Sequence, residues 1–293
     1  MRLVAARPGS KPVPDAIRGL LDTVSEAYLR AVVERVAVPR VYRTPENRVV
    51  REILVDDFSA ALGCDRSTLV VDDVGNVVAG DPRRARVLLG AHYDAVPGTP
   101  GADDNASAVT VLLAVARVVG PREDVCYVAF DGEECSLAGS RWFVERLGPN
   151  RLEQVHVLEM VGYTDRRPGS QRNPVPPVQA PPIGDFLGLV GTQGSSPLLD
   201  HVLATAESAA IPVYGLYLPD VPLEMIRQMA PHVLRSDHAP FWAAGIPALM
   251  WTDTAEFRNP NYHRPTDTPD TLDYPFLVEV ARLLAHAVLT GLG

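Results

Sequence analysis

The sequence has little cysteine. Cys64, Cys126 and Cys135 are the three cysteines among 293 residues. Their small number and irregular spacing argue against a disulfide framework and against a Cys-X-X-Cys zinc site, which fits a reducing compartment. Long apolar runs are also missing, because no stretch approaches the roughly 20 apolar residues that a membrane-spanning helix needs. The sequence therefore predicts no association with a membrane.

Positive charge is in deficit as well. Lys and Arg number 27 against 36 Asp and Glu, which gives a formal net charge of −9, spread along the chain. Such a chain is poorly suited to a phosphate backbone, so we expect no nucleic-acid partner. The N-terminal stretch carries basic residues without the apolar core of a signal peptide. We therefore expect a cytoplasmic protein, or a secreted one if its N-terminus has been trimmed.

Apolar runs of strand length alternate with helical patterns along the chain. Candidate strands span 86–92, 124–130, 154–163, 211–219 and 246–253, with a hairpin over 69–80. Candidate helices span 14–36, 45–62, 105–119, 136–147, 198–209, 238–245 and 273–289. This alternation predicts an α/β fold over residues 1–293, a single domain with a central, mostly parallel mixed sheet flanked by helices. Residues 164–197 are rich in Pro and Gly and predict a long loop insertion near the binding site.

Acidic and imidazole side chains follow or end four of the predicted strands. In chain order they are His92, Asp94, Glu133, Glu134, Glu159 and His263, with Tyr262 beside the last. Ligands of open α/β sheets bind beyond the carboxyl ends of the strands, so these groups are expected to converge. Imidazole and carboxylate ligands without Cys are typical of an open catalytic metal site, and a shared carboxylate would suit two divalent ions.

Ordinary structural roles compete for some of these residues. Asp103 and Asp104 precede a predicted helix, where Asp is a favoured N-cap, and the residues alone do not choose between them as a ligand. Glu159 is harder to explain, because a carboxylate inside a buried apolar strand needs a cation or several donors. The histidines without acidic partners are interpreted as structural: His156, His201, His232 and His286.

Five segments follow one another between about residues 86 and 275: HYDAVPGTPGADDNASAV, FDGEECSLAGSRWF, VLEMVGY, SDHAPFWAAGIPAL and NYHRPTDTPDTLDY. They resemble the successive motifs of the M28 family of di-zinc aminopeptidases and lie in that family's order. The resemblance implies one metallopeptidase domain with a three-layer αβα zinc-exopeptidase fold and two divalent metal ions, most commonly Zn²⁺. By this resemblance one ion would be held by His92 and Glu159, the other by Glu134 and His263, and Asp104 would bridge both. The family's better-known members carry Asp where this chain has Glu159.

The resemblance also implies roles in catalysis. Glu133 would accept a proton from a water that bridges the metals, Asp94 would orient a ligand histidine, and Tyr262 would stabilise the oxyanion. The expected reaction is hydrolysis of the N-terminal peptide bond of peptide substrates. Asp237 and His238 match a family motif beside the site, without a defined role.

Two other functions compete with this prediction. One is a single-zinc enzyme like glutaminyl cyclase, in which a Trp is typical before the final ligand histidine; Tyr262 and the segment DDNASAV favour hydrolysis instead. The other is a catalytically silent binding module of the same fold, although all expected ligand positions are filled. The preferred N-terminal residue, the oligomeric state and a role for Cys135 do not follow from the sequence; Trp242 and Phe257 are candidates for lining a specificity pocket.

Overall fold

The computed structural model describes residues 1–176 and 178–291. Nine strands in these residues form one mixed sheet, in the order β1-β8-β7-β9-β6-β4-β5-β3-β2. Their bounds are β1 Arg2–Ala5, β2 Val70–Val71, β3 Val77–Ala79, β4 Val87–His92, β5 Val125–Phe130, β6 Gln154–Glu159, β7 Leu187–Gly191, β8 Val213–Tyr217 and β9 Ala248–Thr252. The four central strands β9, β6, β4 and β5 are parallel, and antiparallel pairs occur towards both edges.

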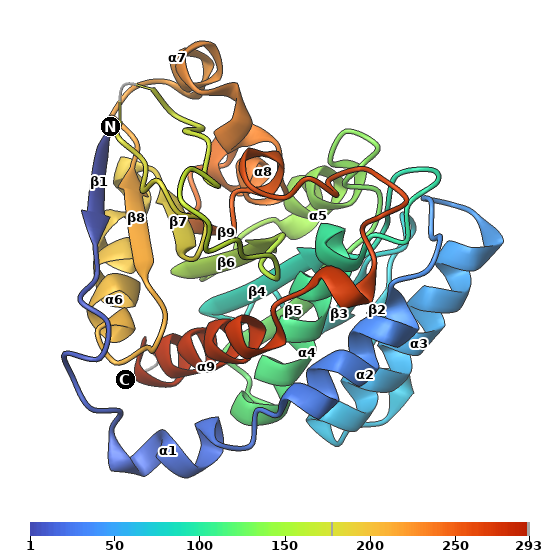
Figure 1. Cartoon of the computed structure of the whole chain (residues 1–293). Coiled ribbons are helices and arrows are strands. Elements are labelled where there is room, and N and C mark those ends of the chain that lie inside the picture. The colour runs from blue at the N-terminus through green and yellow to red at the C-terminus, as the bar shows by residue number, and fades with distance from the viewer. Residues whose placement is uncertain (177, 292–293) are drawn as a thin grey trace.

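Helices cover both faces of this sheet (Figure 1). Helices α2, α3, α4, α6 and α9 pack on one face, and α5, α7 and α8 on the other. The helix bounds are α1 Asp15–Leu21, α2 Glu26–Val36, α3 Pro45–Leu62, α4 Ala108–Val119, α5 Ala138–Leu147, α6 Ser196–Ala206, α7 Leu223–Met229, α8 His238–Ala243 and α9 Tyr274–Gly291. The predicted α/β domain of three layers is confirmed. Within the described residues, no helix combines the length and apolarity needed to cross a membrane.

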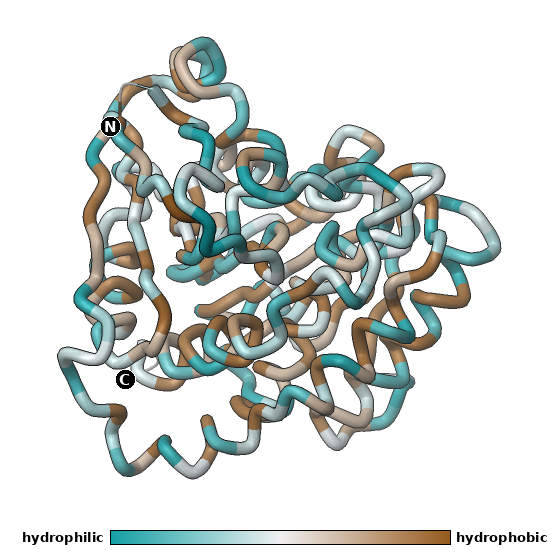
Figure 2. The backbone as a smooth tube through the Cα atoms, viewed as in Figure 1, coloured by the Kyte–Doolittle hydropathy of each residue, from teal (hydrophilic) through white to brown (hydrophobic). Residues whose placement is uncertain are grey.

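The central strands supply two apolar cores, one on each face. In β4, Val87 and Leu89 join the core under α4 and α9, whereas Leu88 joins the core under α5 and α8. Successive strand side chains point to opposite faces, so a strand buried on both sides reads as a continuous apolar run. In Figure 2 the apolar segments follow the strands and the helices packed on them, while many loops are hydrophilic.

Several local boundaries differ from the predictions. The predicted helix 14–36 is two helices, because the chain breaks after Leu21 and Ser25 caps α2 by accepting a hydrogen bond from the Tyr28 amide. The predicted helix 105–119 becomes regular only at Ala108, because residues 102–107 form a wider, irregular helical turn. Strand β1 and helix α7 are too short to stand out in the sequence pattern.

The predicted loop 164–197 is too long. Its last third contains β7, which is fully buried between β8 and β9, and the first residues of α6. Glycine is disfavoured in strands, so Gly188 and Gly191 hid this strand in the sequence. Tertiary hydrogen bonds to both neighbouring strands override that local preference. Residues 164–176 and 178–186 remain largely irregular.

Candidate metal centre

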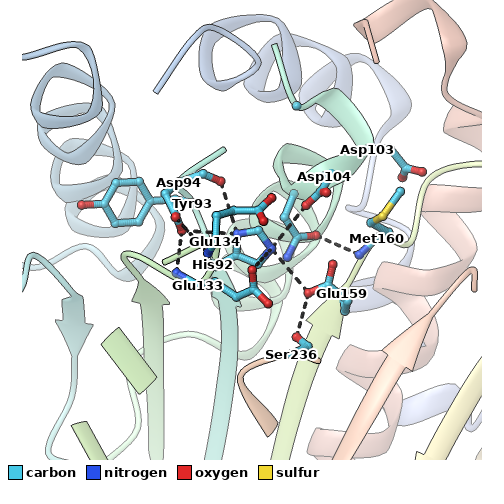
Figure 3. A network of polar contacts seen from close by, with 12 residues as sticks. His92, Tyr93, Asp94, Asp103, Asp104, Glu133, Glu134, Glu159, Met160 and Ser236 are labelled. Atoms are coloured by element: carbon cyan, nitrogen blue, oxygen red, sulfur yellow. Dashed lines mark hydrogen bonds and ion pairs between the residues drawn. The ribbon is translucent and has the colours of Figure 1, made fainter. Parts of the chain in front are cut away.

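The predicted site residues meet at the carboxyl end of the central strands. His92 and Glu159 are the last residues of β4 and β6, and Glu133 and Glu134 follow β5 by a short turn. His263 arrives on the segment between β9 and α9. Figure 3 shows the side chains from the strand ends pointing towards one another. The convergence expected for a parallel sheet is therefore present.

Two three-residue groups in this cluster have the spacing of metal ligands. In the first, His92 Nε2 lies 3.4 Å from Asp104 Oδ1 and 3.4 Å from Glu159 Oε2. In the second, His263 Nε2 lies 3.1 Å from Asp104 Oδ2 and 3.3 Å from Glu134 Oε1. Asp104 gives one oxygen to each group. The arrangement matches a pair of cations that share one carboxylate.

The unpaired atoms of this cluster fit a cation. Among the described residues, His92 Nε2 and Glu134 Oε1 are buried and have no hydrogen-bond partner. Burial, followed by the charge of nearby acids, raises the pKa of Glu133 well above its usual range. Burial alone would lower the pKa of His263, but the carboxylates of Asp104 and Glu134 raise it to about 10. Without a metal, these groups bind protons more tightly than usual. The same carboxylates and imidazoles are suitable ligands for divalent metal ions, which would take the place of those protons.

Asp94 connects the first histidine to the turn after β5. Its carboxylate accepts hydrogen bonds from the Glu133 amide at 3.0 Å and the Glu134 amide at 3.2 Å. Its Oδ1 also lies 3.4 Å from His92 Nδ1. A carboxylate behind a ligand imidazole fixes the ring and its tautomer, which is the role expected for Asp94.

The turn after β5 separates the two adjacent glutamates. Gly132 has φ +74°, and a Cβ there would lie 3.1 Å from the Tyr42 ring, so the turn requires glycine. Glu134 enters the second ligand group, whereas Glu133 Oε2 lies 3.9 Å from His92 Nε2 and belongs to neither group. Glu133 is therefore placed beside the two candidate cation positions without being needed as a ligand.

The structure distinguishes Asp103 from Asp104. The Asp103 carboxylate accepts hydrogen bonds from the Gly162 amide at 2.9 Å and from Asn259 Nδ2 at 2.6 Å, away from the ligand groups (Figure 3). Asp267 accepts from the backbone amides of Asp103 and Asp104, at 2.9 and 3.1 Å. Asp104 is thus the one that faces both histidines, as the family resemblance implied.

Two polar side chains support the ligand-bearing loops, and one of them leaves no signal in the sequence. The Arg40 guanidinium is fully buried and donates to the carbonyls of Tyr93 at 2.5 Å, Gly101 at 2.7 Å and Pro100. Burial lowers the pKa of Arg40 to about 10. No local motif marks this arginine. Ser236, which donates to Glu159 at 2.7 Å, could have been found, because it lies in the SDHAPFWAAGIPAL segment.

Backbone strain gathers at the same place. His263 has φ 56° and Met160, directly after Glu159, has φ 45°, both in the left-handed region that disfavours side chains.

The Tyr262 ring stacks on His263 with centroids 3.8 Å apart. Burial, followed by the charge of Asp104, raises the pKa of Tyr262 far above its ordinary value. Its phenol is thus neutral at ordinary pH.

A cavity of about 420 Å³ opens onto the ligand groups. The ligand residues and their neighbours form a charged end of its lining: Glu133, Glu134, Glu159, Tyr262 and His263. Most of the remaining lining is apolar, namely Leu3, Val175, Val178, Phe186, Leu189, Val190, Leu216, Val233, Leu234, Met250 and Phe257, and it also includes Arg141, His232, Arg235 and Glu256. Residues of the irregular segments 164–176 and 178–186 thus border the cavity, among them Val175, Val178 and Phe186.

Three further predictions can be compared with the cavity. Phe257 lines it, whereas Trp242 lies in the core and donates to the Ala248 carbonyl at 2.8 Å. His232, interpreted as structural, lines the cavity as well.

Asp237 is buried beside the site with both carboxylate oxygens lacking a hydrogen-bond partner among the described residues, and burial raises its pKa to about 7. His238 is buried and its Nε2 lies 2.8 Å from the Val233 carbonyl.

Sequence comparison finds relatives with a similar segment. The chain is 36% identical over 225 residues to the uncharacterized protein YfbL of Escherichia coli, covering 70% of this chain and 67% of YfbL. It is 30% identical over 223 residues to aminopeptidase YwaD of Bacillus subtilis, covering 69% of this chain and 40% of YwaD. The chain thus spans less than half of the named aminopeptidase.

Structural comparison finds the same fold in solved proteins. LapB of Legionella pneumophila matches 98% of this chain and 79% of its own, with a TM-score of 0.69 and 20% identity. Glutaminyl cyclase of Porphyromonas gingivalis matches 91% of this chain and 98% of its own, with a TM-score of 0.61 and 18% identity. At these identities the likeness shows the fold alone.

A match to a family model over most of the chain shows the family. The model of peptidase family M28 matches residues 74–288, which include the five candidate metal ligands and the turn between β5 and α5. This chain therefore belongs to peptidase family M28.

Proposed function

We propose that this protein is a metal-dependent aminopeptidase that binds two divalent ions, most commonly Zn²⁺. The observation that carries the proposal is the pair of ligand groups that share Asp104. The first ion would be held by His92, Asp104 and Glu159, and the second by Asp104, Glu134 and His263. When bound, such ions supply Lewis acidity and lower the pKa of water towards neutrality.

The chain's own groups then account for proton transfer. Glu133 lies beside the ligand groups, and its carboxylate is proposed to take the proton of the attacking water and pass it to the leaving amine. The Asp94 carboxylate accepts hydrogen bonds from the backbone amides of Glu133 and Glu134 and thereby fixes the backbone from which both side chains extend. The neutral phenol of Tyr262 is proposed to donate to the scissile carbonyl oxygen as negative charge develops there.

The charge of the site supports action at a free N-terminus. Several carboxylates gather at the charged end of the cavity, and a protonated α-amine would be favoured beside them. The apolar wall beyond would receive the N-terminal side chain. Its composition favours large apolar residues over acidic or basic ones, because a charged group would lose its hydration there.

The likeness to glutaminyl cyclase gives the second candidate function. That reaction was expected to use one zinc ion, whereas both ligand groups are complete in this chain. The complete groups also argue against a silent binding module, because so many buried acids without cations would be costly. Hydrolysis is therefore the function that the geometry supports best.

A substrate panel tests the proposal. Aminoacyl-p-nitroanilides with Leu, Phe, Lys and Glu are compared with N-acetylated versions and with an N-terminal glutaminyl peptide, each before chelation, after chelation and after metal is returned. We expect cleavage of unblocked Leu and Phe substrates that chelation abolishes and Zn²⁺ restores. Cleavage of blocked substrates, cyclisation of the glutaminyl peptide, or activity indifferent to chelation would each contradict it.

A further inference from the structure

The Tyr262 hydroxyl has an unusual neighbour, Arg235. Arg235 Nη2 donates to the Tyr262 oxygen at 2.7 Å, and Nη1 of the same guanidinium donates to Glu256 Oε1 at 2.5 Å. These residues come from three separate segments: Arg235 follows the short 3-10 turn Pro231–Leu234, Glu256 lies in the turn Ala255–Phe257, and Tyr262 precedes His263. All three line the cavity at its charged end.

The direction of the first hydrogen bond follows from the chemistry of the two groups. A guanidinium carries donors and no acceptor, so the Tyr262 oxygen must be the acceptor. A phenol has one proton to donate, and that proton finds no acceptor within hydrogen-bond distance of Tyr262 among the described residues. Stacking on His263 restricts the ring. The free proton is therefore available to a group that enters the cavity.

The guanidinium of Arg235 is paired within the protein although its side chain is 46% exposed. Glu256, whose side chain is 27% exposed, accepts from Nη1. The same Nη1 lies 3.4 Å from His232 Nδ1. A guanidinium paired with a carboxylate on one edge and a phenol on the other is held in one orientation, which suits a support better than a free anion-binding group.

We propose that Arg235 is a positioning residue for Tyr262, held in turn by Glu256. This inference rests on the proposed function, because it concerns the donor that would meet the scissile carbonyl oxygen. Arg235 fills the acceptor side of the phenol and holds the hydroxyl so that its proton points into the cavity. Arg235 itself acts through Tyr262 and does not contact the reacting atoms.

A double-mutant cycle tests the proposal by activity. The variants are Arg235→Met, Tyr262→Phe, the two combined, and Arg235→Lys, with Arg227→Met as the matched control, since Arg227 is also an exposed arginine paired with a glutamate but lies outside the cavity lining. We expect Arg235→Met to lower kcat about tenfold or more with KM changed less than about threefold, as for loss of an oxyanion donor's placement. Once Tyr262 is Phe, removing Arg235 should add less than about twofold. Arg235→Lys should restore part of kcat, and Arg227→Met should leave kcat unchanged.

Other results would overturn it. If the two losses multiply, or if Arg235→Met mainly raises KM, Arg235 acts on the substrate and not through Tyr262. A measurement without turnover separates this inference from the proposed function: ¹⁹F NMR of protein containing 3-fluorotyrosine, with the Tyr262 signal assigned from Tyr262→Phe. That signal should shift or broaden in Arg235→Met and stay unchanged in Arg227→Met. An unchanged signal in Arg235→Met refutes the positioning role, whereas an inactive wild-type protein with the expected shift refutes only the aminopeptidase function.

Discussion

Asp103 and Asp104 are neighbours in the chain, both are buried, and their surroundings are opposite. Burial alone would raise the pKa of Asp104, but His263 and His92 hold it well below its usual range. Burial and the adjacent Asp253 instead raise the pKa of Asp103 well above its usual range. The difference teaches that the partners of a buried carboxylate, more than its burial, decide whether it is a ligand or part of the scaffold.

The largest effect should come from Glu133, the carboxylate that belongs to neither ligand group and supports no ligand. Glu133→Gln keeps the shape of the side chain but removes the proton acceptor, so kcat should fall by about 10²–10⁴ or more. Metal content, measured by mass spectrometry, should stay at the wild-type level. Glu134→Gln is the matched control and should lose metal. An active, metal-replete Glu133→Gln protein would refute the proposed base.

Substituting each neighbour in turn tests the comparison directly. Asp104→Asn should lower metal affinity and activity together, because it removes the charge shared by both ligand groups. Asp103→Asn should keep the metal and instead lower the free energy of unfolding by about 1–3 kcal/mol, because the bond from Asn259 is disturbed. Metal titration and urea unfolding measure the two effects. Equal metal loss in both variants would mean that the two acids are not distinct.

The pH dependence of stability should carry the signature of the scaffold acids. Burial raises the pKa of Asp253, the neighbour of Asp103, to about 6 despite the charge of Arg258. A raised pKa means that the folded protein prefers the protonated acid. Its contribution is therefore complete below about pH 4, the ordinary pKa of Asp, and is lost as pH rises through about 6.

Asp253→Asn checks this window. In chelated protein, the wild-type free energy of unfolding should fall by on the order of 2 kcal/mol between about pH 4 and pH 7 relative to the variant. Urea unfolding across this range, with Asp73→Asn at an exposed acid as the control, gives the difference. A variant with the same pH slope as the wild-type protein would show that Asp253 is charged throughout.

The smallest effect is expected at Cys135. It follows Glu134 directly, yet its side chain is exposed. Partial loss of hydration, followed by the negative charges of Asp94 and Glu134, raises the pKa of its thiol. A protonated thiol outside the ligand groups has no part in the proposed chemistry. Cys135→Ser should change kcat/KM less than about twofold. A loss of metal or a tenfold loss of activity would bring this thiol into the site.

The sequence predicted the parts of the site that depend on strand ends. A buried strand followed by His92, or by the Glu133 and Glu134 pair, is visible in the order of residues, and parallel pairing brings such ends together. The choice between Asp103 and Asp104 came from the family resemblance, because both precede the same helix. Their orientation depends on Asp267 and Asn259, which lie more than a hundred residues away.

Other features left no local signal. Arg40 supports two loops through carbonyl groups, and any backbone has carbonyls, so its partners cannot be inferred from residue types. The pairing of Arg235 with Glu256 and Tyr262 could not be inferred either, because these partners lie on other segments of the chain. The glycines of strand β7 concealed its strand pattern in the sequence. Its hydrogen bonds to β8 and β9 stabilise the strand in the sheet. Tertiary contacts decided each of these cases.

The ligands come from widely separated parts of the chain, and His263 lies on the last segment before α9. Ions bound here would tie that segment to the middle of the sheet. Because a ligand that binds only the folded state stabilises it by mass action, chelation should expose the segment 254–273 to proteases before the rest of the chain. Metal uptake would then report the completion of folding, as well as the assembly of the site.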